Sequence, residues 1–330
     1  MPPTVSKQDP RVRPPIPPPS ADPLADALPV GEIPHNWVNM ILYGVNGIGK
    51  TTLACDFPKP LLLVSFEPGT TGGSQSVRNL AGVTFKAVDS KVLAVDICRR
   101  LERDSRSNWR RGKDGTWVAL KDAEGRPSYT GEPFVTHILD SCTSLQDMVL
   151  KELMGCKDMP VQLNWGTVPE GYYQARSEIA KEVMQLYRNL EANTIYIALE
   201  KDHNAKTEDR KVLTRGLQLE SFFSADLGQA TVKWMRNACD YICQLYIARE
   251  VKRHPDKRVK GPDGKVVVRP GEEYETGRFV RRLRTLFHGN YDARMRSPDR
   301  TAVPEYIEEP TFDLIARVIR GERIAGGKYQ

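Results

Sequence analysis

Eight consecutive residues near the start of the chain have the types and spacing needed to bind a phosphate group. They match every constrained position of the G-x-x-x-x-G-K-[ST] phosphate-binding loop: Gly44, Val45, Asn46, Gly47, Ile48, Gly49, Lys50 and Thr51. Glycine lets a backbone curl so that successive N–H groups face a phosphate. We predict that this loop, together with Thr52, binds ATP, that Lys50 reaches the β- and γ-phosphates, and that Thr51 holds Mg²⁺.

Two acidic residues stand where such a loop needs a metal partner and a group that aligns water. Asp140 ends the apolar run 135–139, and we interpret it as the Walker B aspartate that holds the water shell of Mg²⁺. An alternative role as the cap of the next helix is compatible with this one. Glu67 follows the apolar run 61–65 and would polarise a water for in-line attack, unless it only begins a surface turn.

Three polar residues follow a further apolar run, at 194–199. Glu200, Lys201 and His203 would lie at the same edge of the sheet, where one of them would sense the γ-phosphate. Which of them does so stays open. Glu200 is included among the candidate catalytic residues, and the lone His203 is the weakest candidate.

Five arginines near the C-terminal end are candidates for completing the site of a neighbouring subunit in an oligomer, as an arginine finger does. They are Arg281, Arg282, Arg284, Arg294 and Arg296. We favour Arg294 and Arg296, which lie just beyond a predicted strand. Most of the five are expected to be ordinary exposed arginines.

The elements that must position these residues alternate along the chain. Residues 39–43 and 51–55 read as the strand and the helix that flank a phosphate loop. Alternation of strands with helices is typical of an α/β fold with a mostly parallel sheet covered on both faces. The other predicted strands are 61–65, 83–88, 135–139 and 194–199, and the predicted helices are 90–101, one opened near Thr143 by a capping box with Gln146, and 171–192.

The pattern changes after Asp240. Strands predicted at 241–247 and 278–287 flank the turn signal Gly261-Pro262-Asp263-Gly264, which indicates an antiparallel C-terminal hairpin appended to the main sheet. A last helix is predicted at 310–320, opened by Pro310 in its first turn. Residues 35–330 are interpreted as one ATPase domain, with inserts at 105–132 and 250–280.

Composition sets the class of protein. Residues 1–34 hold eleven prolines and are predicted to be a disordered arm, either inert or docked in a partner's aromatic groove. No run has the length of a membrane span, and the first residues do not resemble a signal peptide. The six cysteines form no C-x-x-C pair, which disfavours zinc and suggests reduced thiols in a cytoplasm, of a bacterium or a phage-infected cell.

The net charge of +6 is concentrated in one part of the chain. Residues 249–300 contain 15 Lys or Arg and 8 Asp or Glu, a net charge of +7. Such an excess attracts nucleic acid phosphates, although it is also typical of a solvated hairpin. If the chain resembles RecA-like assemblies, the segments 156–173 and 202–230 would face DNA. The first contains Trp165, Tyr172 and Tyr173, and the second contains Phe222 and Phe223 among basic residues, which would stack on bases and neutralise phosphates unless the aromatics dock these loops onto the core.

The order of these features resembles the RecA-type ATPase core, and within it the phage ATP-binding proteins of the Sak single-strand-annealing group. The resemblance covers roughly residues 37–319, with the phosphate loop as its specific motif. It implies ATP hydrolysis coupled to single-stranded DNA binding. It assigns nucleotide binding to Lys50, metal binding to Thr51 and Asp140, and catalysis to Glu67. Where recombinases commonly carry an amide as γ-phosphate sensor, this chain has Glu200 and Lys201. The two inserts are not parts of the family pattern.

The predicted function is therefore ATP binding and hydrolysis by a RecA-like homo-oligomer that anneals or pairs single-stranded DNA in recombination. Three alternatives stay open. A replicative-type DNA helicase motor would unwind a forked duplex. A P-loop small-molecule kinase would transfer phosphate to a metabolite and ignore DNA. A non-catalytic module would bind ATP without turnover.

Overall fold

The fold is described by a computed structural model of the chain. It describes the following residues: 37–67, 77, 79–106, 109–111, 117–119, 134–155, 170–202, 213–214, 217–218, 223–227, 229–255, 257–260, 266–269, 271–288, 291–325 and 329. The predicted proline-rich arm, residues 1–34, lies outside them. So do His203, Cys156 and most of the predicted DNA-facing segments.

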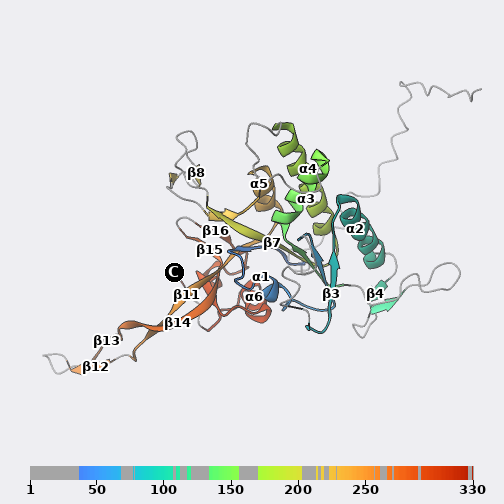
Figure 1. Ribbon diagram of the computed structural model, residues 1–330. Helices are drawn as coiled ribbons and strands as arrows, with labels where there is room; N and C mark the ends of the chain where they lie inside the picture. Colours follow the sequence, from blue (N-terminus) through green and yellow to red (C-terminus); the bar gives the residue numbers. More distant parts are fainter. Residues whose placement is uncertain are drawn as a thin grey trace, which may run out of the picture. The chain divides into compact units, whose positions relative to one another are not determined.

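Helices and strands alternate over the first two thirds of the described chain (Figure 1). The helices are α1 Lys50–Ala54, α2 Lys91–Arg106, α3 Cys142–Met154, α4 Glu170–Arg188, α5 Gln229–Ala238 and α6 Phe312–Ile319, with a 3-10 turn at Arg300–Ala302. The strands of the main sheet are β1 Asn39–Gly44, β2 Leu61–Ser65, β3 Val83–Ala87, β6 Thr136–Asp140, β7 Asn193–Asp202, β10 Phe223–Ala225, β11 Tyr241–Arg253, β14 Glu273–Arg284, β15 Leu286–His288, β16 Tyr291–Arg294 and β17 Tyr306–Glu308. Three short hairpins are formed by β4 Trp109–Arg111 with β5 Trp117–Ala119, β8 Leu213–Thr214 with β9 Leu217–Gln218, and β12 Lys257–Lys260 with β13 Val266–Arg269.

The centre of the main sheet is parallel. Its strands follow the order β11-β1-β7-β6-β2-β3, and each neighbouring pair in this series is parallel. Strand β1 therefore lies in the middle, and β7 separates it from β6. Because all six strands end at one edge, the residues that follow them are brought together. The predicted α/β fold with a mostly parallel sheet is confirmed.

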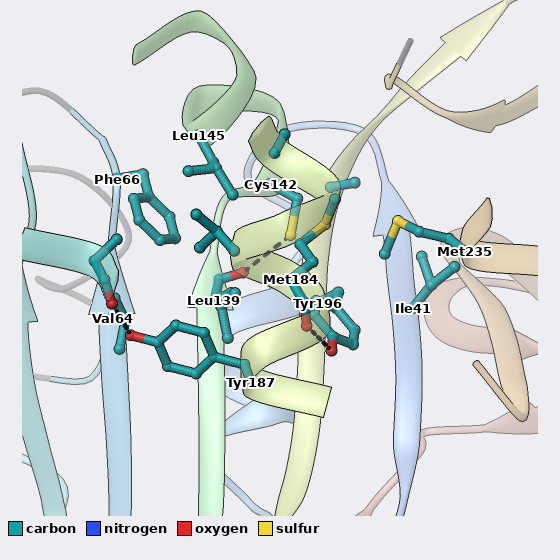
Figure 2. Packing of buried hydrophobic residues seen from close by; sticks show 14 of the residues in the cluster. Ile41, Val64, Phe66, Leu139, Cys142, Leu145, Met184, Tyr187, Tyr196 and Met235 are labelled. Carbon is teal, nitrogen blue, oxygen red and sulfur yellow. Dashed lines mark hydrogen bonds between the residues drawn. The ribbon is translucent and has the colours of Figure 1, made fainter. Parts of the chain in front are cut away.

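Helices cover both faces of this sheet, each face over its own apolar core. On one face α2, α3, α4 and α5 pack over residues such as Tyr43, Leu139 and Tyr196. Figure 2 shows this core, in which the Tyr196 hydroxyl donates to the Met184 carbonyl at 2.8 Å. On the other face α1 and α6 pack over a second core. Alternate residues of each strand supply the two cores, as the pleat of a buried sheet requires.

The start of helix α3 differs from the prediction. The capping box of Thr143 with Gln146 does not form. Instead the side chain of Ser141 accepts the N–H of Ser144 at 3.2 Å, and Ser141 is the N-cap. The Gln146 amide donates to Thr231 at 2.8 Å, a buried contact that joins α3 to α5. A tertiary partner thus replaces the local one that sequence spacing indicated.

Two other helix boundaries are corrected in the same way. Helix α4 ends at Arg188, not at 192, because residue 190 already turns back to bond the Tyr187 carbonyl. Helix α6 begins at Phe312, and its cap is Thr311, so Pro310 precedes the helix rather than opening it. The carboxylate of Asp56 also accepts the Phe312 N–H at 2.7 Å, which ties the start of α6 to the end of α1.

The C-terminal part adds antiparallel strands to the sheet. Strands β11 and β14 pair from Gln244 with Arg284 to Arg253 with Glu273, and β17 pairs with the outer edge of β14. Beyond their paired ends lies the β12–β13 hairpin, which extends away from the helices in Figure 1. The predicted C-terminal antiparallel extension is confirmed, and both of its strands are longer than the sequence indicated. Strands β10 and β16 and helix α5 were not predicted.

Two further sequence expectations concern membrane-spanning segments and the cysteines. None of the helices in the described ranges has the length and apolar character needed to cross a bilayer. The five described cysteines, Cys55, Cys98, Cys142, Cys239 and Cys243, are buried free thiols. Burial raises the pKa of all five thiols, to about 12 for Cys55, Cys98, Cys239 and Cys243. These thiols therefore stay protonated at neutral pH.

Candidate nucleotide-binding site

The phosphate-binding motif forms the turn between β1 and α1 at the carboxyl edge of the sheet. Its first glycine, Gly44, ends β1 against the neighbouring strand β11. A Cβ atom on Gly44 would stand 2.3 Å from the carbonyl oxygen of Leu245, so a side chain there would collide with backbone. Gly49 has φ 92°, in the left-handed region that favours glycine, and it is the N-cap of α1. Gly47, with φ 74°, lies in the same region, so all three glycines of the loop are required by packing or backbone geometry.

The lysine and the threonine of the motif have defined partners. The Lys50 ammonium donates to the carbonyls of Gly44 at 2.9 Å and Val45 at 2.8 Å, which folds the side chain back over the turn. The Thr51 hydroxyl donates to an Asp140 carboxylate oxygen at 2.7 Å. This second bond crosses β7, because Thr51 follows β1 while Asp140 ends β6. It joins the loop to the predicted Walker B aspartate.

Glu67 is placed beside Asp140 by the register of two strands. Ser65, the last residue of β2, pairs with Asp140, the last residue of β6. The N–H of Phe66 then donates to the Asp140 carbonyl at 2.7 Å, and Glu67 is the next residue. The N–H of Glu67 reaches the Ser65 hydroxyl at 3.4 Å, and the Glu67 side chain is half-buried. The two predicted carboxylates therefore lie at neighbouring strand ends.

Burial dominates the electrostatics of this group. It lowers the pKa of Lys50, which is only 7% exposed, against the charges of Asp140, Glu67 and Glu200, which raise it. Burial also raises the pKa of Asp140, which is 4% exposed, against the hydrogen bond from Thr51. Buried charges are retained where they are paired or where a ligand completes them. A bound phosphate would favour the charged form of Lys50, and a bound cation would favour the charged form of Asp140.

The donor set suits ATP with Mg²⁺. Mg²⁺ keeps much of its water shell and therefore needs few protein ligands. The hydroxyl of Thr51 and the carboxylate of Asp140 would supply them, together with oxygens of the nucleotide phosphates. Among the described residues no group of three or more His, Cys, Asp or Glu side chains is arranged to hold a metal ion by itself. The turn from Gly44 to Thr51, with Thr52 next in α1, has the backbone geometry of a phosphate cradle.

Gln244, which the sequence analysis missed, links two of its candidate residues, Glu200 and Arg284, in a polar chain. Glu200 follows Leu199, which pairs with Gly44. Its carboxylate accepts the Gln244 amide N–H at 2.6 Å, and the Gln244 carbonyl oxygen accepts an Arg284 N–H at 2.9 Å. Gln244 is 3% exposed. The available signal was one polar residue inside the apolar run 241–247, since a buried amide requires partners.

The other residues predicted near Glu200 are placed differently. Lys201 forms an ion pair with Asp226, the residue that follows β10, at 3.1 Å. His203 lies outside the described residues. The predicted DNA-facing segments 156–173 and 202–230 are also mostly outside them, so the roles assigned to their aromatic and basic residues stay predictions.

Arg294 and Arg296 lie at the opposite edge of the sheet from the phosphate loop. Arg294 pairs with Ile242, near the start of β11, and its guanidinium donates to the Cys239 carbonyl at 2.7 Å and to the Arg236 carbonyl. It thereby caps the end of α5. Arg296 forms an exposed ion pair with Asp240 at 2.6 Å. Neither reaches the loop of its own subunit, and a role in a neighbouring subunit stays a prediction.

The mostly parallel α/β sheet and the phosphate-binding turn between β1 and α1 together define a class of protein, the P-loop nucleotide-binding proteins. The profile of the AAA domain family (AAA_24) matches residues 37–286, and the chain belongs to this family. A search of curated proteins gave no match. Among solved structures, the chain is similar to the flagellar accessory protein FlaH from Methanocaldococcus jannaschii, at 10% identity and a TM-score of 0.30, over 83% of this chain and 90% of that one.

Proposed function

We propose that this protein is a Mg²⁺-dependent ATPase of the RecA-like type that binds single-stranded DNA and promotes its annealing or pairing as a homo-oligomer. The observation that carries the ATPase part is the 2.7 Å hydrogen bond between Thr51 and Asp140, which joins the phosphate loop to the acidic end of β6. Membership of the AAA domain family supports the same reading.

Each side chain of the site has a proposed task. Lys50 would leave its loop carbonyls and bind the β- and γ-phosphates. Thr51 and Asp140 would hold Mg²⁺, which neutralises charge on the phosphates when bound. Glu67 would orient and polarise the attacking water, because it lies one strand from Asp140 at the same edge. Glu200 is the proposed sensor, since its charge acts on Lys50 and its carboxylate is bonded to Gln244.

The DNA part of the proposal has separate support. The basic excess of residues 249–300 falls largely on β11, β14 and the hairpin between them. Such a surface neutralises phosphates without reading sequence. The resemblance to phage single-strand-annealing proteins of the Sak group points to the same substrate. The trans arginine remains part of the proposal, and Arg296, with an exposed side chain, is more accessible for it than Arg294.

Phosphate release from ATP tests the ATPase part. Lys50→Ala should abolish turnover, because it removes the cation that reaches the transferred phosphate. Lys86→Ala, at an exposed lysine on β3, is the matched control and should hydrolyse ATP at the wild-type rate. Wild-type turnover in Lys50→Ala would reject the proposal. Tight ATP binding with no turnover, with or without DNA, would instead indicate a non-catalytic module.

Oligonucleotide binding tests the DNA part independently. Affinity for a labelled single strand should fall steeply between low and moderate salt, since phosphate contacts release counterions. An affinity that does not change with salt would contradict phosphate binding. Unwinding of a forked duplex would identify a helicase motor. Phosphoryl transfer to a metabolite, unaffected by DNA, would identify a kinase.

A further inference from the structure

Arg281 lies beside the phosphate loop, although 232 residues separate it from Gly49 in the sequence. It stands on β14, opposite Ile247 of β11, and β11 pairs with β1 next to the loop. A Cβ atom built on Gly49 would be 3.4 Å from the Arg281 guanidinium nitrogen Nη1. The guanidinium therefore lies next to the loop of its own subunit.

Glu309 fixes the direction of this guanidinium. One carboxylate oxygen of Glu309 accepts from Nε and Nη2 of Arg281, at 3.2 and 3.1 Å, and the other accepts the Arg281 backbone N–H at 3.1 Å. The N–H of Glu309 donates back to the Arg281 carbonyl at 2.8 Å. Glu309 itself has φ 41°, a left-handed conformation that few residues other than glycine adopt. Held in this way, Arg281 directs Nη1 at the loop.

A cavity lies against the same guanidinium. It has a volume of about 280 Å³, and its walls include Arg281 and the first residues after the phosphate motif, Thr52 and Leu53. Lys59 adds a second cation, and Asp56 and Thr311 belong to the contact between α1 and α6. Because Thr52 directly follows the loop, a molecule with its phosphates in the loop has room to continue into this space.

We propose that Arg281, oriented by Glu309, is a phosphate ligand that the same subunit supplies to a bound nucleoside triphosphate, and that the adjoining cavity receives its nucleoside. This inference rests on the proposed nucleotide binding and adds a residue to it. The guanidinium would form charge-assisted hydrogen bonds with the phosphate chain from the side of β14. A trans arginine finger would be a different group, contributed by another copy of the chain.

The next residue provides a matched control. Arg282 forms the same kind of pair with Glu308, at 3.0 and 2.8 Å, and its guanidinium stacks over Tyr306. Consecutive residues of a strand point to opposite faces. Arg282 therefore has the same charge, the same strand and the same type of partner as Arg281, but it lies on the face away from the phosphate loop.

Calorimetric titration with a non-hydrolysable ATP analogue and with inorganic tripolyphosphate tests the inference. Arg281→Ala should raise the Kd of both ligands by about ten- to a hundredfold, the range expected for charge-assisted hydrogen bonds. Glu309→Gln keeps the arginine but weakens its orientation, so a smaller rise is expected. Arg282→Ala and Glu308→Gln should bind both ligands as the wild type does. Circular dichroism and thermal unfolding check that each variant is folded.

The outcomes separate this inference from the proposed function. If the wild type binds the analogue, Lys50→Ala loses it and folded Arg281→Ala binds normally, only the role of Arg281 is overturned. Equal losses in Arg281→Ala and Arg282→Ala would also overturn it, because they would indicate a general charge effect. If the wild type binds neither ligand, the proposed nucleotide binding fails, and this inference fails with it.

Discussion

Two of the places where cations and carboxylates meet on the sheet have sharply different surroundings. At the carboxyl edge, Lys50 and Asp140 are almost fully buried, and the hydroxyl of Thr51, next to Lys50, donates to Asp140. On the antiparallel extension, Arg249 and Glu275 pair at 2.7 Å with side chains 62% and 55% exposed. Both places combine cations with carboxylates. Only the first keeps them out of water.

This difference separates a site from a solvated surface. Removing an ionised group from water is unfavourable unless hydrogen bonds or an opposite charge compensate for the lost hydration. Buried charges are therefore retained where they have a structural or ligand-binding role. Exposed pairs have a small effect on stability, and their presence says little about chemistry. The comparison predicts that substitutions at the edge have large effects and that substitutions on the extension have small ones.

The largest effect is expected at Asp140. Asp140→Asn keeps the size of the side chain but removes the charge that would hold Mg²⁺, and we expect ATP hydrolysis to fall by about 10²- to 10³-fold. Phosphate release at saturating ATP measures this. Asp96→Asn, at an exposed acid of α2, is the control and should be unaffected. If Asp140→Asn and Asp96→Asn hydrolysed ATP at comparable rates, burial would not separate a carboxylate of the site from an exposed one.

The next effect concerns the loop itself. Gly44→Ala places a Cβ atom 2.3 Å from the Leu245 carbonyl oxygen, and we expect the free energy of unfolding to fall by about 3 kcal/mol. Urea denaturation measures the change. Gly171→Ala in α4 is the control, because a Cβ there meets no atom within 4 Å, and it should stabilise the helix slightly. A Gly44→Ala variant as stable as wild type would mean that β1 and β11 separate easily.

A third effect is expected at a buried residue near the start of β6, away from the carboxyl edge. His137, on β6, is 3% exposed, and within the described part of the chain neither ring nitrogen has a hydrogen-bond partner. Burial lowers the pKa of His137 from 6.5 to about 3. The unfolded chain therefore binds a proton that the folded chain excludes, and stability falls as the pH drops from about 6.5 towards 3.

The variant His137→Leu removes this titration. Between pH 7 and pH 5 the wild type should lose about 2 kcal/mol more of its unfolding free energy than the variant does, from the protonation of the unfolded histidine alone. Denaturant titrations at both pH values measure the difference. Equal losses in the two proteins would show that His137 is accessible to protons in the folded state.

The sequence predicted the parallel core well because its signals are local. An apolar run such as 61–65, followed directly by an acidic residue, indicates both a buried strand and what stands at its end. Asp140 and Glu67 were found in this way, and the structure places them side by side through the β2–β6 register. The phosphate motif likewise carries its own strand, turn and helix.

The contacts that long-range strand pairing creates beside the loop were not predicted. Gln244 is on β11 and Glu200 is on β7. Their side chains come within hydrogen-bond distance because both strands pair with β1, which sets their relative register. Arg281 reaches Gly49 only through the β11–β14 pairing, which no short stretch of sequence encodes. The sequence favoured Arg294 and Arg296 for the site of a neighbouring subunit, which stays a prediction; within its own subunit Arg294 caps the end of α5. Position along the chain did not reveal which edge of the sheet an arginine would reach.

The smallest effect on stability is expected at the exposed pair. Arg249→Ala should lower the free energy of unfolding by less than about 1 kcal/mol, since water and salt already screen its bond with Glu275. If the extension binds DNA, the same variant should bind all sequences more weakly and reduce the dependence of log affinity on log salt by about one unit. Anisotropy titrations across a salt series measure that slope. An unchanged slope would place the DNA contacts elsewhere, and a large loss of stability would show that exposure alone does not identify a weak pair.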